Sequence, residues 1–174
     1  MRVLVGYASG GGSTASIAEA VAAALHARGH EVVARTMDEV SDARSYDAYV
    51  LGSAVRDQAW LPLGRDFLAA QRKALCGKPV WLFSVGMPGA LSGPWRRWAS
   101  LAEADLLAGL LDHVAPIDHR LFTGVVSAER FGWFGALVFR AVGGRFGDFR
   151  EWPAIEMWSS SIAEALSEIE AASR

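Results

Sequence analysis

The chain has 174 residues, of which 52% are hydrophobic and 21% are charged. This size and composition favour a single compact domain and exclude an intrinsically disordered chain. The formal net charge of −2 supplies no basic surface, so we expect no nucleic-acid partner. The single cysteine, Cys76, has no disulfide partner in the chain. We therefore expect a cytoplasmic protein, either soluble or held peripherally at the inner face of the membrane.

Short apolar runs alternate with helical patterns from the first residues onward. Residues 3–7 predict a buried strand, and apolar residues at four-residue intervals from Ile17 to Leu25 predict a helix that ends near Gly29. Further strands are expected at 31–35, 47–52, 79–84 and 114–122. Further helices are expected at 61–75, 101–113 and 153–172. Residues 131–148 fit no strand-helix unit and indicate an insertion.

Strands that alternate with helices pair in parallel through right-handed crossovers. We therefore predict one α/β domain over residues 1–174, with an insertion at about 124–150. Its core is a doubly wound five-stranded parallel sheet of order 2-1-3-4-5, with helices on both faces. In such sheets ligands bind outside the carboxyl ends of the strands, so the loops at these ends are the candidate site.

The loop between the first strand and the first helix is rich in glycine and hydroxyl residues: Ser9, Gly10, Gly11, Gly12, Ser13 and Thr14. Glycines let backbone N–H groups face an anion, and the hydroxyls can donate to phosphate oxygens. A P-loop lysine and the glycine spacing of dinucleotide-binding proteins are both absent. The alternative, a flexible turn that only caps the helix, stays open.

Residues 7–14, followed by Ile17 and Ala18, resemble the phosphate loop of flavodoxins. The resemblance implies a flavodoxin-like fold with FMN as the cofactor. The family's loop usually has a hydroxyl residue where this chain has Gly11. The loop after the fourth strand would bind the isoalloxazine ring through Ser84, Val85, Gly86, Met87 and Gly89.

Residues 51–56, 118–124 and 147–152 resemble one branch of this superfamily, the menaquinone-dependent protoporphyrinogen oxidase family. The likeness implies that Ser53, Ala54 and Val55 contact the flavin, and that Arg56 holds either a substrate carboxylate or the negative edge of the flavin. In that family an aromatic residue usually follows the arginine, whereas Asp57 and Gln58 stand here. Trp60 would either cover the flavin ring in its place or pack at the start of a helix.

The resemblance implies an FMN-dependent oxidoreductase whose partner is a quinone or another small redox molecule. The most specific activity that the resemblance implies is the oxidation of protoporphyrinogen IX in haem biosynthesis. Two alternatives remain open: an electron-carrying flavodoxin, which usually docks through a strongly acidic surface, and a binding module that has lost FMN. We expect His119 either to make a structural hydrogen bond or to transfer a proton. No histidine has the spacing of a metal ligand.

The aromatic residues of 131–139 indicate either contact with a membrane or an apolar substrate, or packing on the edge of the domain. A homodimer also remains open.

Overall fold

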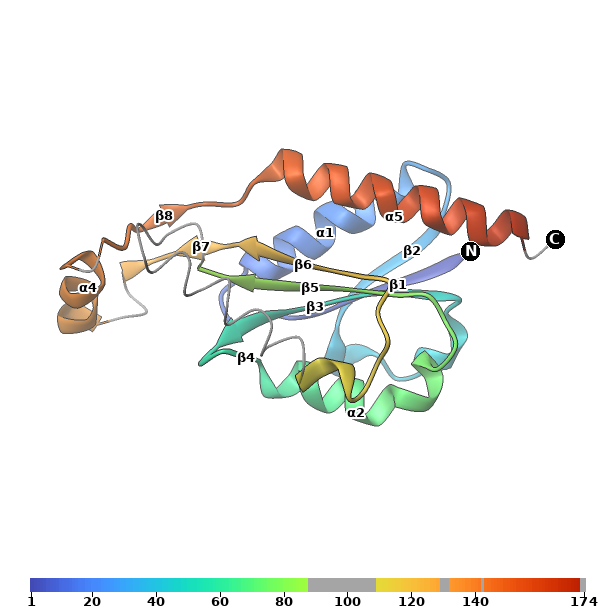
Figure 1. The fold of residues 1–174 in the computed structure, drawn as a ribbon, viewed down its shortest axis with the longest axis horizontal. Helices are drawn as coiled ribbons and strands as arrows, with labels where there is room; N and C mark the ends of the chain where they lie inside the picture. The colour runs from blue at the N-terminus through green and yellow to red at the C-terminus, as the bar shows by residue number, and fades with distance from the viewer. Residues whose placement is uncertain (88–108, 129–131, 142, 173–174) are drawn as a thin grey trace.

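The computed structural model describes residues 1–87, 109–128, 132–141 and 143–172 (Figure 1). The strands are β1 (Arg2–Ala8), β2 (Glu31–Thr36), β3 (Ala48–Arg56), β4 (Ala59–Trp60), β5 (Val80–Gly86), β6 (Asp118–Thr123), β7 (Val125–Val126) and β8 (Gly147–Asp148). The helices are α1 (Ser13–His26), α2 (Pro62–Leu75), α4 (Gly132–Ala141) and α5 (Trp152–Ala172), with short 3-10 turns at Met37–Glu39 and Ala43–Ser45.

Five strands form a parallel sheet in the order β2-β1-β3-β5-β6. Counted along the chain, this is the predicted order 2-1-3-4-5, which is therefore confirmed. The short strand β4 pairs antiparallel with β3, outside the main path. Because the five main strands run the same way, their carboxyl ends meet at one edge of the sheet.

Helices cover both faces of the sheet, with α1 and α5 on one side and α2 on the other (Figure 1). The predicted apolar stripe of α1 faces the sheet, since Ile17, Val21 and Leu25 are all fully buried. Helix α5 packs beside α1 and buries Ile162 and Leu166 in the same cluster. These helices remove the sheet from water on that face, as a parallel sheet requires.

Gly52 in β3 is needed because an aromatic ring lies directly over it. A Cβ atom placed on Gly52 would lie 2.1 Å from Cζ of Phe83. The Phe83 ring is itself packed against the rings of Phe122 and Trp158, at centroid distances of 6.4 and 6.0 Å. The ring therefore has little room to move aside, and glycine is the residue that fits.

Three segments differ from the sequence-based expectations. The fifth parallel strand begins at Asp118 rather than at Val114, because Pro116 precedes it. Strand β3 continues to Arg56 and turns back into β4 rather than ending near residue 52. The insertion at about 124–150 has its own secondary structure, since β7 pairs antiparallel with β8 and α4 lies between them. Most of the helix expected at 101–113 lies outside the described residues.

Candidate functional site

The register of the sheet brings three of the predicted loops together. Ala8 at the end of β1 pairs with Ser53 of β3, and Ser53 pairs with Ser84 of β5. The chain leaves β1 and β5 at this same edge. The glycine-rich loop therefore lies next to the ends of β3 and β5, as expected for one site.

The start of α1 has no side chain that caps it. Its N-cap residue, Gly12, has a φ of 89° and offers no side-chain hydrogen bond. The Gly12 N–H donates to Oγ of Ser9 at 3.1 Å, which folds the loop back on itself. N–H groups in the first turn of an uncapped helix are unpaired donors, and together with the helix dipole they attract an anion. Since no side chain caps α1, the alternative of a turn that only caps the helix rests on the backbone of Gly12 alone.

Thr14 has a buried hydroxyl group that no described residue satisfies. The residue is 1% exposed, and its Oγ1 has no hydrogen-bond partner among the described residues. A buried hydroxyl without a partner costs about 1–3 kcal/mol. An acceptor such as a phosphate oxygen would remove this cost, so the hydroxyl is suited to a bound anion.

Arg56 places a positive charge beside the loop. Its Nη2 lies 3.8 Å from the position that a Cβ atom on Gly10 would take. The side chain is exposed and makes no ion pair with any described residue. Asp57 and Gln58, with φ angles of 50° and 60°, form the two-residue turn that follows. Aspartate tolerates this left-handed conformation better than a bulky aromatic side chain does.

Arg150 contacts the start of α1, a contact that no spacing in the sequence indicated. Its Nη1 donates to Oγ of Ser16 in the first turn of α1, at 2.7 Å. Its Nε and Nη2 hold both carboxylate oxygens of Asp148, and these hydrogen bonds lower the pKa of Asp148 to about 2. Gly124, at the other end of the insertion, lies so close to Ser13 that a Cβ atom would come within 2.8 Å of Oγ. Both ends of the insertion therefore contact the start of α1.

A buried polar chain links β4, β5 and β6 behind this edge. Trp60 is 1% exposed, and its Nε1 donates to Oγ of Ser84 at 2.7 Å. The same Oγ shares a hydrogen bond with Nε2 of His119 at 2.9 Å. Burial lowers the pKa of His119, which favours the neutral ring. This contact fits the structural interpretation of His119.

The burial of Trp60 fits its interpretation as a packing residue, since a role in covering the flavin requires the ring to leave this position. Ser53 is also fully buried, accepting from the N–H of Leu61 at 3.1 Å and donating to the carbonyl of Ala54 at 2.9 Å. The buried side chains of Trp60 and Ser53 therefore stabilise the strands that form the candidate site.

The remaining predicted residues lie at the edge itself. Ala54 and Val55 are half-buried in β3, and Val85 is buried in β5. Gly86 ends β5, and Met87 follows it with 42% of its surface exposed. Gly89 lies outside the described residues. Whether these residues contact a cofactor stays a prediction.

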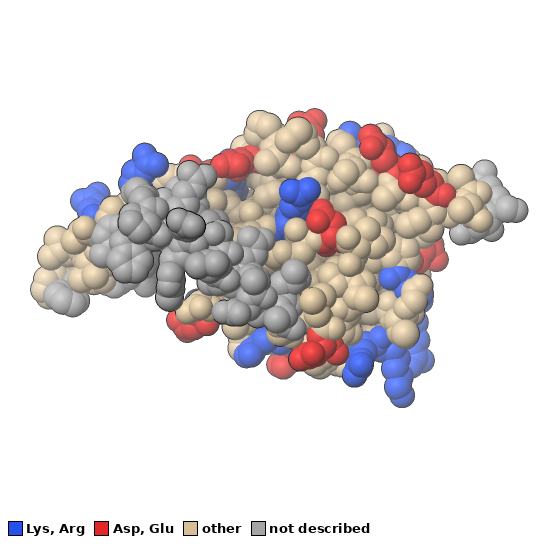
Figure 2. Space-filling view, viewed as in Figure 1, with Lys and Arg blue, Asp and Glu red and all other residues tan. Residues whose placement is uncertain are grey.

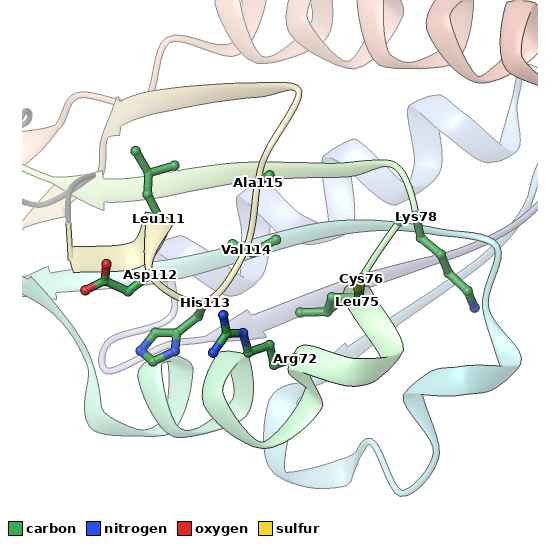
Figure 3. Close-up of a pocket in the computed structure, with 10 residues that line it drawn as sticks. Arg72, Leu75, Cys76, Lys78, Leu111, Asp112, His113, Val114 and Ala115 are labelled. Carbon is green, nitrogen blue, oxygen red and sulfur yellow. The ribbon is translucent and has the colours of Figure 1, made fainter.

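A cavity of about 350 Å³ lies elsewhere, at the amino ends of β5 and β6 (Figure 3). Its wall comes from the end of α2 and from residues 76–78 and 111–115. Arg72 and His113 both line it, and Figure 3 shows the side chain of Lys78 pointing away from the other labelled residues. The Nζ of Lys78 is bound to the carbonyls of Arg44 and Tyr46. This cavity is at the edge opposite the glycine-rich loop and is separate from the candidate site.

The described residues contain no group of three or more His, Cys, Asp or Glu side chains that could hold a metal ion. None of the helices in this part of the chain is long and apolar enough to cross a membrane.

A family model described as a flavodoxin domain matches residues 4–144. No curated protein matches the chain. Among solved structures, a flavodoxin from the domain Archaea is similar at 14% identity, covering 96% of this chain and 99% of that one, with a TM-score of 0.58. Flavodoxin 2 from Bacillus cereus is similar at 23% identity, covering 97% of this chain and 99% of that one, with a TM-score of 0.56.

The rubredoxin oxygen:oxidoreductase of Desulfovibrio gigas is similar at 16% identity and a TM-score of 0.58, and covers 96% of this chain but 36% of that one. These structural likenesses show the fold. Because the family model covers most of the chain, this protein belongs to the flavodoxin domain family.

Proposed function

We propose that the chain binds FMN at the carboxyl edge of its sheet and works as an electron-transfer flavoprotein. The observation that carries the proposal is the buried hydroxyl of Thr14, unpaired among the described residues, at the start of an uncapped helix. Membership of the flavodoxin domain family and the names of the similar structures, several of which are flavodoxins, support the same cofactor.

The residues present fit the phosphate group of FMN. Backbone N–H groups of the glycine-rich loop and the first turn of α1 would face the phosphate oxygens, and Oγ1 of Thr14 would donate to one of them. Arg56 would balance part of the negative charge. FMN supplies the transfer of electrons, and the protein supplies binding, orientation and electrostatics.

Titration with FMN and with riboflavin tests the proposal, because riboflavin lacks the phosphate. We expect quenching of FMN fluorescence that saturates at one equivalent, and binding of riboflavin that is about tenfold or more weaker. NAD should not compete, since the glycine spacing of dinucleotide-binding proteins is absent. Equal affinities for FMN and riboflavin would contradict the assignment of the phosphate site. If neither flavin binds, the alternative of a binding module that has lost FMN is the better one.

Arg56→Gln should reduce the preference for FMN over riboflavin, because it removes the charge beside Gly10. Arg65→Gln is the matched control, since Arg65 is also exposed but lies on α2. An unchanged preference in Arg56→Gln would exclude Arg56 from the phosphate site.

An oxidoreductase that acts on an apolar molecule, such as a quinone or protoporphyrinogen IX, is the second candidate. The observation in its favour is the exposed apolar surface of α4, where Trp133 is 82% and Leu137 60% exposed. Reoxidation of chemically reduced, FMN-loaded protein by a menaquinone analogue separates the two candidates. A rate that saturates with quinone and falls sharply in Trp133→Ala supports the enzyme. An equal rate with any soluble electron acceptor supports the carrier.

A further inference from the structure

Helix α4 lies apart from the sheet and its covering helices, at one end of the molecule (Figure 1). The antiparallel pair of β7 and β8, in which Val125 pairs with Asp148, carries it there. The insertion is fixed at its base, because Phe149 donates its N–H to the carbonyl of Gly124 at 3.3 Å. Helix α4 therefore lies away from the sheet and its covering helices, and the β7–β8 pair connects it to them.

The two sides of α4 differ in exposure. Phe139 is 8% exposed and packs on Val126 and on the Phe146 ring, at a centroid distance of 5.2 Å. Trp133 and Leu137 are four residues apart and so share another face, with 82% and 60% of their surfaces exposed. Such large exposed apolar side chains on one helix face mark an interaction surface. We call Trp133 and Leu137 the outer face of α4.

The segment that carries this face is basic in sequence. Residues 132–147 contain Arg140 and Arg145 and no acidic residue. Arg140 is in the last turn of α4, with its guanidinium 5.6 Å from the centre of the Phe146 ring. Along the chain the flanking acids are Glu129, next to Arg130 in the sequence, and Asp148, which is held by Arg150. At the end of the molecule where α4 lies, the coloured atoms visible in Figure 2 are uncharged or basic.

We propose that the outer face of α4 docks on the surface of a membrane that contains anionic phospholipid. Trp133 and Leu137 would enter the boundary between headgroups and acyl chains, and Arg140 and Arg145 would lie at the phosphates. A second copy of this chain fits less well, because facing patches would bring four arginines together. The exposed apolar side chains described on α4, which are Trp133, Leu137 and Val138, also cover far less than the area of about 1,000 Å² that a stable dimer buries.

Sedimentation of the full chain with phosphatidylcholine vesicles, with and without phosphatidylglycerol, tests this proposal. We expect binding that requires phosphatidylglycerol and weakens with added salt. Trp133→Ser combined with Leu137→Ser should weaken binding about tenfold or more, since two large apolar groups no longer leave water. Arg140→Gln combined with Arg145→Gln should weaken it by a similar factor, from about fivefold for each arginine.

Two control variants match these changes elsewhere on the surface. Met157→Ser removes a side chain that is 70% exposed on α5, and Arg65→Gln removes an exposed charge on α2. Both should bind vesicles as the parent does. All changes are at exposed side chains, and far-ultraviolet circular dichroism checks that each variant is folded.

Three results would overturn the proposal. The parent chain could fail to sediment with anionic vesicles, or the Trp133 and Leu137 variant could bind as well as the parent. A concentration-dependent dimer in analytical ultracentrifugation, lost in the same variant, would identify a second copy as the occupant of the outer face. Binding to vesicles does not require FMN, so a failure here is distinguishable from a failure of the proposed function.

Discussion

Thr14→Val should make the free protein more stable and its complex with FMN weaker. Valine has the same shape and a similar helix propensity, so the change removes little except the hydroxyl. In the free protein Oγ1 is buried and has no partner among the described residues, and relief of this cost should raise the free energy of unfolding by about 1 kcal/mol. In the complex, a hydrogen bond to a charged phosphate is lost. Such a bond contributes about 1.5–3 kcal/mol, so the affinity for FMN should fall about ten- to hundredfold.

Urea unfolding of the apoprotein gives the first quantity, and fluorescence titration with FMN gives the second. Ser159→Ala is the control for affinity, because it removes a buried hydroxyl from α5 that already donates to the carbonyl of Ile155 at 2.8 Å. That variant should bind FMN as the parent does. If Thr14→Val lowers the stability of the apoprotein and leaves FMN affinity unchanged, the hydroxyl has a partner in the protein and does not face a phosphate.

Three further predictions follow from the packing and the charges. Gly52→Ala should lower the free energy of unfolding by about 1–3 kcal/mol in urea, whereas Gly109→Ala, with open space around it, should not. Burial lowers the pKa of His119 below its ordinary 6.5, so the unfolded chain takes up the proton first and stability should fall as the pH drops through 6.5. Urea unfolding between about pH 7.5 and about pH 5.5 should show a shallower pH dependence for His119→Gln, and an equal dependence would assign the effect to another group. In Arg150→Gln the pKa of Asp148 should rise from about 2 toward 3.8 in an NMR titration, and an unchanged value would refute the role of Arg150.

The parallel sheet and the helix stripes could be predicted because their signals are local. Ile17, Val21 and Leu25 repeat with the period of a helix, and β1, β3 and β5 are largely apolar runs bounded by glycine or polar residues. The glycine-rich loop was found for the same reason, since its composition and its place after the first strand lie within a few residues. The strand order then follows from the family resemblance and the rules for doubly wound sheets.

Long-range contacts have no such signal. Arg150 contacts Ser16 across 134 positions in the chain, so no spacing in the sequence could reveal it. The turn at Asp57 and Gln58 could not be predicted, because it lacks the Asn-Gly or Asp-Gly pair that usually marks a two-residue hairpin. Trp60 shows the limit most clearly, since its type suits a flavin-covering residue and only the structure shows that its ring is buried.

The hydrogen bond between Phe149 and Gly124 has a consequence for how this chain can vary. The chain leaves the rest of the domain at Gly124 and returns at Phe149, and these two residues are hydrogen-bonded to each other. The segment between them is therefore a loop whose two ends lie next to each other. Closing a longer loop costs only slightly more entropy, because the cost grows with the logarithm of its length. Residues 125–148 therefore form a separable module, which evolution or a protein engineer can lengthen, shorten or exchange while the five-stranded sheet stays the same.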